Sequence, residues 1–561
     1  MKWQSTRPYL RRLLGPVIDI GAYCASIGLG ASSARSQLAG FAAAAAFCYL
    51  PSVLARGPGD RAPDPFVHVH LLAVTLLAFF LRSGVFAMLT GGWGWPGPAA
   101  IAATALATLA VVRPGYAYCV SYPRWRLGSG DGWRAGAVGV VVFAAALRLI
   151  YSGRVELMPE ETYYWNYARH LDFGYLDHPP MVGWLIGAGT ALFGDTEFGV
   201  RSGALCCGAV GSWFAFRLTR NLFGEPSGLV ALVLMQALPF FFLSGMLMTP
   251  DAPLTAAWSA TLYFLERALI AARREAWWGV GLCFGLGLLS KYTIGLLGIS
   301  TLIFMLLDRN SRPWLRRWEP YGAALLALAI FSPVIVWNAR NEWASFVFQT
   351  SRRLADRPGF ALHRLIASAL VLLTPTGLAA AGSLLAGRNP QVDGRGEPVA
   401  QQRAWRFLQL SILVPLAVFA AFSLRHEVKL DWTGAPCAAV VPALAFGIVH
   451  YGQSALAGPR AWIRSAWTPT ILILLLIYAA GLYDLALGIP GLGYGKHAEL
   501  VPVGWRELGG QIDGIAEKIG KADGREPLIV GMDRYAIASE LAFYGPDRAR
   551  SVAPSATPST P

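Results

Sequence analysis

The sequence predicts an all-α polytopic membrane protein, which carries a small α/β cap after its last apolar segment. Hydrophobic residues make up 55% of the 561 residues and charged residues only 14%, against about 25% charged in an average soluble domain. The cores of soluble domains cannot hide so much apolar surface, so lipid must be the solvent for most of this chain. The apolar residues also gather in runs of about 20 residues, which is the length of helix that crosses a bilayer.

About fifteen apolar runs of this kind occur, and short arginine-rich segments separate many of them. The runs lie near 13–30, 36–55, 66–90, 97–120, 132–152, 198–216, 228–247, 252–272, 276–290, 292–307, 319–337, 361–387, 405–424, 433–451 and 465–489. When successive runs are threaded from a cytoplasmic N-terminus, most short basic loops fall inside, as the positive-inside rule requires. Inner-side arginines therefore explain most of the net charge of +14, and nucleic-acid binding is not needed to account for it.

The character of the chain changes after the last apolar run. Residues 503–521 have the pattern of an amphipathic helix, residues 527–532 that of a short buried strand, and residues 535–545 that of a second helix. We therefore expect residues 491–545 to form a small α/β cap on the outer side of the membrane. Residues 546–561 are rich in Ala, Pro, Ser and Thr, and we expect a disordered tail there.

The loop at 153–197 is long, falls on the outer side and holds most of the candidate site residues. Glu160 and Glu161 are adjacent carboxylates, and a GYLDHPP segment follows with Asp177 and His178. A hydrated loop with an interfacial belt of Tyr and Trp would contain similar residues. Loops of this length in membrane proteins are often functional, which favours a site.

Three more outer segments hold candidate residues, and two of these residues, Asp251 and Lys291, have a structural alternative. Asp251 would cap a helix N-terminus as well as serve as an active-site acid. Lys291 would either reach the interface from an apolar segment or bind an anion in the interior. Arg340 lies on the outer side against the positive-inside rule, which favours an anionic partner. Asp431, in a further outer segment, could equally belong to an ordinary solvated loop.

Acids and cations on one membrane face suit a transfer reaction. A carboxylate can act as general base on a hydroxyl acceptor. Arg, Lys or His can bind a phosphate and stabilise it as it leaves. A donor with a lipid tail would explain why the site lies at the surface of the bilayer, but this argument does not identify a sugar.

Several separated motifs resemble those of the GT-C superfamily of polyprenyl-phosphate-sugar glycosyltransferases. EETYYW, GYLDHPP and WLIGAGTALFGDTEFGVR in residues 158–205 resemble the first outer loop of that superfamily. TPDAPL, LSKYT, SPVIVWNARNEWASF and DWTG follow in the same order, so the resemblance covers about residues 130–545. The most similar branch is the bacterial one related to protein O-mannosyltransferases and aminoarabinose transferases. The resemblance implies a transmembrane catalytic domain at 130–490.

The resemblance also implies a role for each candidate residue in an inverting sugar transfer. Glu160 matches the general base. The superfamily usually has Asp at this position, so the carboxylate of Glu160 lies one methylene further from the backbone. The other implied roles are acceptor orientation for Asp251, support for Glu161, donor-phosphate binding for His178, Lys291 and Arg340, and a substrate loop with Tyr163, Tyr164 and Asp177. Asp177 and His178 are potential ligands of a divalent metal, but two ligands are too few to predict one.

Residues 1–123 lie outside this resemblance. Their four apolar runs and basic start resemble the GtrA-like four-helix membrane family, whose members are thought to help move or present polyprenyl-linked sugars. The alternative is that these helices only pack against the catalytic domain.

The expected partners are a polyprenyl-phosphate sugar donor, a lipid, glycan or protein acceptor, and membrane lipids, without nucleic acid. The expected location is the bacterial inner membrane, with a cytoplasmic N-terminus and a periplasmic or extracellular cap. A flippase for lipid-linked sugars, with an inactive transferase fold, is the alternative from another class. Such a transporter would be expected to show inverted repeats, and the sequence has no visible internal symmetry of that kind. A structural scaffold is a third reading, which leaves the outer-face motifs unexplained.

Overall fold

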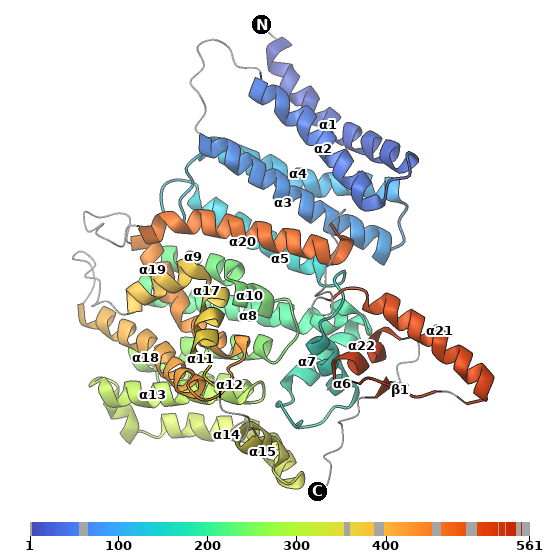
Figure 1. The fold of residues 1–561 in the computed structure, drawn as a ribbon. Coiled ribbons are helices and arrows are strands. Elements are labelled where there is room, and N and C mark those ends of the chain that lie inside the picture. The colour runs from blue at the N-terminus through green and yellow to red at the C-terminus, as the bar shows by residue number, and fades with distance from the viewer. Residues whose placement is uncertain are drawn as a thin grey trace. The chain divides into compact units, whose positions relative to one another are not determined.

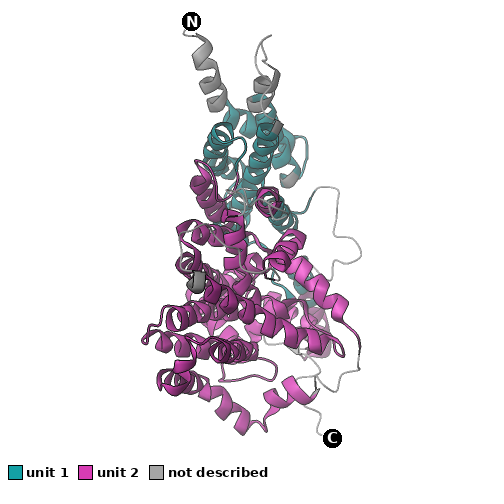
Figure 2. Ribbon diagram, turned by 90° about the vertical axis from the view of Figure 1, so that its left-hand side faces the viewer, with its two compact units in different colours: residues 1–125, 145–158, 472–512 teal, residues 126–144, 159–471, 513–561 magenta. Residues whose placement is uncertain are grey.

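The protein is described here from a computed structural model, in which helices dominate (Figure 1). The residues that the structure describes are 3–54, 65–352, 359–385, 398–450, 462–489, 502–525, 527–532, 535–545 and 551–552. They fall into two compact units, shown in teal and magenta in Figure 2. Unit 1 comprises residues 1–125, 145–158 and 472–512, and unit 2 comprises residues 126–144, 159–471 and 513–561.

Unit 1 contains the four N-terminal helices. They are α1 (Trp3–Gly28), α2 (Ser33–Leu54), α3 (Pro65–Ala87) and α4 (Gly97–Ser121). Inside this unit the guanidinium of Arg82 on α3 forms an ion pair with Asp19 on α1, and its Nη2 donates to Asp19 Oδ1 at 3.1 Å. Both side chains are buried, so these two charges compensate each other within the apolar helix bundle.

Three helices contribute residues to both units. They are α5 (Trp133–Tyr151), α20 (Trp462–Leu487) and α21 (Trp505–Asp523). The division between the units at residues 512 and 513 therefore falls inside the predicted cap. The predicted domain boundaries at residues 123, 130 and 490 stay predictions.

Unit 2 contains most of the remaining helices. They are α6 (Pro159–Arg169), α7 (Met181–Phe193), α8 (Glu197–Phe223), α9 (Glu225–Ala237), α10 (Pro239–Ser244), α11 (Asp251–Leu265), α12 (Ala276–Leu288), α13 (Gly295–Leu307), α14 (Glu319–Arg340), α15 (Ala344–Val347), α17 (Leu362–Leu385), α18 (Pro398–Ser423), α19 (Val440–His450) and α22 (Ala536–Tyr544). Helices α8, α9, α11 and α19 form its centre, and α11 and α19 are almost completely buried.

Small residues and prolines shape this centre. Gly208 of α8 lies against the backbone of Gly245, where a methyl group would come within 2.8 Å of Gly245 Cα. Such contacts let helix backbones approach closely, which is how helices pack in lipid. The predicted run at 228–247 is divided into α9 and α10 at Pro239, which has no N–H to continue the helical hydrogen bonds.

Eight helical segments among the described residues are long and apolar enough to cross a membrane, which confirms an α-helical polytopic protein. The predicted total of about fifteen spans stays a prediction. The pair predicted as short near 276–307 forms helices of 13 residues each, α12 and α13.

The C-terminal segment has the predicted order of elements. The amphipathic helix is α21, the strand is β1 (Ile529–Val530), and the second helix is α22. β1 pairs in parallel with β2 (Ser551–Val552), so two residues of the predicted disordered tail form a strand, and the rest of that tail lies outside the described residues.

Candidate active site

The acid pair at the start of α6 points in two directions. α6 begins with Pro159, whose missing N–H costs nothing in the first turn, and two carboxylates in that turn suit the positive end of the helix dipole. Glu161 is completely buried, whereas Glu160 is exposed. The two adjacent glutamates therefore cannot have the same role.

Glu161 fastens α6 to the rest of unit 2. Its carboxylate accepts hydrogen bonds from Arg201 Nη2 at 2.6 Å and Arg201 Nε at 2.9 Å, and from the backbone N–H of Met248 at 3.0 Å. The side chains of Glu161 and Arg201 are both 0% exposed. Glu161 thus links α6 to α8 and to the turn before α11, which is a positioning role.

Glu160 projects from the other side of α6. Residues three, four and seven positions later share its face, and these are Tyr163, Tyr164 and Tyr167. The Glu160 side chain makes no ion pair or hydrogen bond with the part of the chain that the structure describes. Its carboxylate is therefore available to a substrate.

The tyrosines on this face gather around Asp177. Asp177 Oδ1 accepts a hydrogen bond from the Tyr163 hydroxyl at 3.2 Å and another from the Tyr167 hydroxyl, and the two hydroxyl oxygens are 2.9 Å apart. The Tyr164 ring lies edge-on to His178 with centroids 5.7 Å apart. The Tyr175 ring stacks on Tyr167, and the Tyr535 ring lies tilted against Tyr163. These five residues, Tyr163, Tyr164, Tyr167, Tyr175 and Tyr535, are called the tyrosine cluster below.

Lys291 joins two carboxylates in a second group. Its Nζ donates to Asp251 Oδ1 at 3.0 Å and Oδ2 at 3.1 Å, and to Asp431 Oδ2 at 2.6 Å. Asp251 is the first residue of α11, Lys291 lies in the extended break after α12, and Asp431 lies in the 3-10 turn Leu430–Thr433. The ammonium of Lys291 thus bridges the carboxylates of Asp251 and Asp431. The three residues are called the Lys291 bridge below.

Burial and charge act on the pKa values of both groups. Burial raises the pKa of Asp251, although the ammonium of Lys291 acts in the opposite direction. Burial would lower the pKa of Lys291, but the two carboxylates outweigh it and raise that pKa. Burial raises the pKa of Tyr164, and the nearby carboxylates of Asp177 and Asp251 raise it further. Tyr164 therefore lies where the tyrosine cluster meets the Lys291 bridge.

Arg340 is exposed at the end of α14, and its side chain makes no ion pair or hydrogen bond with the described residues. Its neighbours on α14 do contact other segments. Trp337 Nε1 donates to Asp172 Oδ2, between α6 and α7, at 2.7 Å, and Asn338 Oδ1 accepts from the N–H of Phe346 at 3.3 Å. The end of α14 is thus attached to the loop that holds the tyrosine cluster.

Sequence reasoning left two site residues without a role. For Asp431 the sequence is equally consistent with an ordinary solvated loop. Arg201 is the last residue of the WLIGAGTALFGDTEFGVR motif, and the motif assigns it no role. Both are partners of a buried opposite charge in a segment far away in the sequence. The signal available in the sequence was that each lies inside a segment of the quoted motifs.

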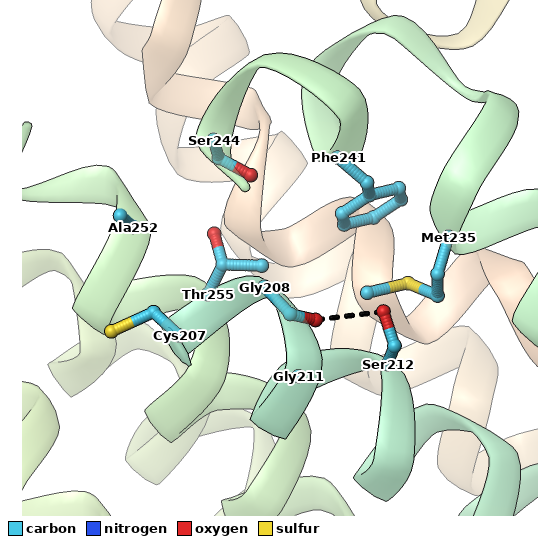
Figure 3. A pocket seen from close by; sticks show the side chains of 9 residues that line it. All are labelled: Cys207, Gly208, Gly211, Ser212, Met235, Phe241, Ser244, Ala252 and Thr255. Atoms are coloured by element: carbon cyan, nitrogen blue, oxygen red, sulfur yellow. Dashed lines mark hydrogen bonds between the residues drawn. The ribbon is translucent and has the colours of Figure 1, made fainter. Parts of the chain in front are cut away.

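A small pocket lies inside unit 2, between α8, α9, α10 and α11 (Figure 3). Its polar lining includes Ser212, whose hydroxyl donates to the carbonyl of Gly208 and accepts from Gln236 Nε2 at 2.9 Å. The pocket has room for about one water molecule. It is too small for a sugar or a lipid phosphate, so it is not a substrate pocket.

Within the described residues, no group of three or more His, Cys, Asp and Glu side chains could hold a metal ion. Asp177, one of the two potential ligands, is engaged by tyrosine hydroxyls.

The sequence comparisons connect this site to membrane glycosyltransferases. Residues 177–337 match the family described as dolichyl-phosphate-mannose-protein mannosyltransferase. Over 280 residues the chain is 30% identical to the undecaprenyl phosphate-alpha-4-amino-4-deoxy-L-arabinose arabinosyl transferase of Pseudomonas aeruginosa PAO1, which covers 46% of this chain and 47% of that protein. The same-named protein of Edwardsiella ictaluri is 27% identical over 215 residues, 34% of this chain and 38% of that protein. The chain spans about half the length, or less, of these relatives.

The fold is shared with a solved structure. ArnT from Cupriavidus metallidurans in the apo state has a TM-score of 0.51 at 18% identity, covering 73% of this chain and 84% of that one. ArnT bound to undecaprenyl phosphate has a TM-score of 0.52 at 18% identity, covering 76% of this chain and 86% of that one.

The shared fold and the matched segment make the chain similar to GT-C-type polytopic membrane proteins, the class that the motifs resemble. Within that superfamily, the relatives it matches are bacterial aminoarabinose transferases, and together with the apolar helices they indicate a multi-pass protein of the bacterial inner membrane. The resemblance of residues 1–123 to the GtrA-like family stays a prediction.

Proposed function

We propose that the protein is an inverting glycosyltransferase, which moves a sugar from a polyprenyl-phosphate carrier to a hydroxyl acceptor at the outer face of the membrane. The observation that carries this proposal is the exposed carboxylate of Glu160 on the tyrosine-bearing face of α6, which has no partner among the described residues. The names of the relatives, which specify an undecaprenyl-phosphate-linked sugar, support the class of donor.

In the proposed reaction Glu160 is the general base. It takes the proton of the acceptor hydroxyl, whose oxygen attacks the anomeric carbon from the side opposite the phosphate. The bond between the anomeric carbon and the phosphate oxygen breaks, and the phosphate leaves with the electron pair, so the configuration inverts. Glu161 is tied to Arg201 and positions α6, whereas Asp251 would orient the acceptor.

The donor phosphate requires cations near the anomeric carbon. His178 and Arg340 are the proposed ligands: His178 lies in the outer loop itself, and Arg340 ends α14, which Trp337 attaches to that loop. Lys291 stays a proposed third ligand, but its ammonium already bridges two carboxylates, with which a phosphate would have to compete. The simpler role for Lys291 is to neutralise one of two neighbouring acids and to hold Asp251 in place.

The orientation of the protein in the membrane and its acceptor follow from the same proposal. The N-terminus would be cytoplasmic, and the site and the C-terminal segment would face the periplasm or the outside, as the arginine distribution predicts. The acceptor would be a lipid, a glycan or a protein with a free hydroxyl group.

Transfer by purified protein in detergent tests the proposal, with synthetic polyprenyl-phosphate sugars offered one at a time. We expect wild-type protein to form product and Glu160→Gln to lose at least a hundredfold in kcat without loss of thermal stability. Glu225→Gln is the matched control, because Glu225 is also an exposed glutamate in the first turn of a helix. Full activity of Glu160→Gln would contradict the role of the base.

The transporter alternative has its own outcome. Wild-type protein that forms no product with any donor, but moves a labelled polyprenyl-phosphate sugar across the bilayer of proteoliposomes, would favour a flippase over a transferase.

A further inference from the structure

Helix α22 from the C-terminal segment packs against α6, although the two are more than 350 residues apart in the chain (Figure 1). Phe543 of α22 meets Trp165 of α6 edge-on, with ring centroids 5.1 Å apart. One helical turn earlier, Ser539 Oγ accepts a hydrogen bond from Asn166 Nδ2 at 3.2 Å. Trp165, Ser539 and Phe543 are all buried, so this contact excludes water.

The same helix also contacts α8, the helix that carries the partner of Glu161. The hydroxyl of Tyr544 donates to Glu197 Oε1 at 3.3 Å, and Glu197 is the first residue of α8. Arg201, one turn further along α8, holds Glu161 of α6. α22 therefore contacts both helices that the buried Glu161–Arg201 pair joins.

The N-terminal end of α22 lies over the tyrosine-bearing face of α6. Tyr535, which precedes α22, places its ring 4.6 Å from the ring of Tyr163. Tyr163 lies three residues after Glu160 on the same face, and its hydroxyl is bonded to Asp177. α22 thus supports α6 along its length, from the turn that holds Glu160 to the turn that holds Asn166.

α6 needs such support because it has only 11 residues. Isolated helices of that length are not stable in water, so tertiary contacts must fix the position of α6. The Glu161–Arg201 pair fixes one side, and α22 covers another. A displacement of about 1 Å in a catalytic group can cost roughly a hundredfold in rate.

We propose that α22 is a clamp on α6 that positions Glu160, with Tyr535, Ser539 and Phe543 as positioning residues. The inference rests on the proposed function, since it assigns these residues to the same reaction. It makes the C-terminal segment part of the catalytic apparatus and not only a cover. The clamp acts on the base, so its loss lowers kcat and leaves the KM for the donor almost unchanged.

Side-chain variants test the clamp in the full-length protein. We expect Phe543→Ala to lower kcat at least tenfold with the donor KM within twofold of wild type, and Phe543→Leu to retain at least a third of the wild-type kcat. Ile537→Ala is the matched control, because Ile537 lies on the exposed face of the same helix and is 38% exposed. We expect this variant to keep wild-type kinetics. A wild-type kcat for Phe543→Ala would overturn the clamp.

A disulfide separates positioning from general loss of structure. The Asn166 and Ser539 side chains meet, so Asn166→Cys with Ser539→Cys is expected to crosslink α6 to α22 on oxidation, as mass spectrometry would detect. In the Phe543→Ala background, oxidation should restore kcat and reduction should lower it again, while Phe543→Ala alone does not respond. Failure of the crosslink to form, or its formation without recovery of kcat, overturns the proposal.

These results also separate the clamp from the proposed function. Wild-type protein that forms no product contradicts the transferase assignment, whereas the crosslink still reports whether α22 is docked. Product from wild type together with unaffected Phe543 variants contradicts the clamp alone.

Discussion

Lys291 and Asp431 are 140 residues apart in the chain, yet the ammonium of one donates a hydrogen bond of 2.6 Å to the carboxylate of the other. The same ammonium binds both carboxylate oxygens of Asp251. One cation thus joins three segments at one end of the helices of unit 2. Two acids share one cation in this group, next to the tyrosine cluster.

The two acids of the Lys291 bridge differ in burial, and this difference predicts unequal effects on stability. The Asp251 side chain is 11% exposed and the Asp431 side chain 36%. Hydrogen bonds to charged groups contribute about 1.5–3 kcal/mol when desolvated, and less when water competes. Thermal unfolding in detergent should therefore show a larger loss of stability for Asp251→Asn than for Asp431→Asn. Equal losses would show that the two contacts are equivalent.

Replacing Lys291 by Met should make stability depend more strongly on pH. The variant leaves buried carboxylates without their counter-ion, and burial already raises the pKa of Asp251 in the folded protein. A carboxyl group with a raised folded pKa contributes stability below its unfolded pKa, and that contribution is lost as pH rises through the folded pKa. The stability deficit of Lys291→Met should thus be greater at pH 8 than at pH 5.

A control for that experiment lies on the same segment as Asp431. Lys429 is exposed, and Lys429→Met should show no pH-dependent deficit. Transfer kinetics of Lys291→Met test whether Lys291 also binds the donor phosphate. An unchanged KM for the donor would remove Lys291 from the phosphate site.

Replacement by Gln should lower the stability of the protein at Glu161 but not at Glu160, where it should lower the transfer rate. Glu161→Gln leaves Arg201 buried without its opposite charge, and breaking a buried pair in this way costs about 3–5 kcal/mol. Glu160→Gln changes an exposed carboxylate, so its thermal stability should stay within about 0.5 kcal/mol of wild type. Unfolding curves and transfer rates of both variants, measured side by side, check the division of roles. A Glu161→Gln protein as stable as wild type would refute it.

The buried pair in unit 1 gives an independent prediction. Asp19→Asn should destabilise the protein by about 3–5 kcal/mol, because Arg82 is completely buried and loses its opposite charge. The double replacement Asp19→Leu with Arg82→Met should recover most of this loss, since apolar residues of similar size often replace a buried pair at little cost. Thermal unfolding of the three variants tests both statements. A double variant less stable than Asp19→Asn would mean that the pair has a further role.

Local patterns in the sequence predicted many of the helices of this protein, but α6 and α7 lie within residues 153–197, which were predicted as a loop. Runs of apolar residues mark helices such as α14, α17 and α20 because lipid admits only segments whose backbone groups are satisfied internally. The order of helix, strand and helix in residues 503–545 was also readable, because amphipathic and buried segments differ in period. The acid pair, Asp251 and Lys291 were found as candidates because charged residues are rare beside apolar runs.

The sequence by itself thus determined a polytopic helical protein with its polar candidates in a few motifs. Only the tertiary structure decided which charges meet. It placed Glu161 inside against Arg201 and left Glu160 exposed, it joined Lys291 to Asp431, and it laid α22 on α6. The reason is physical: local patterns depend on neighbours along the chain, whereas a buried charge must find its opposite charge in space, on whichever segment the packing of the helices brings beside it.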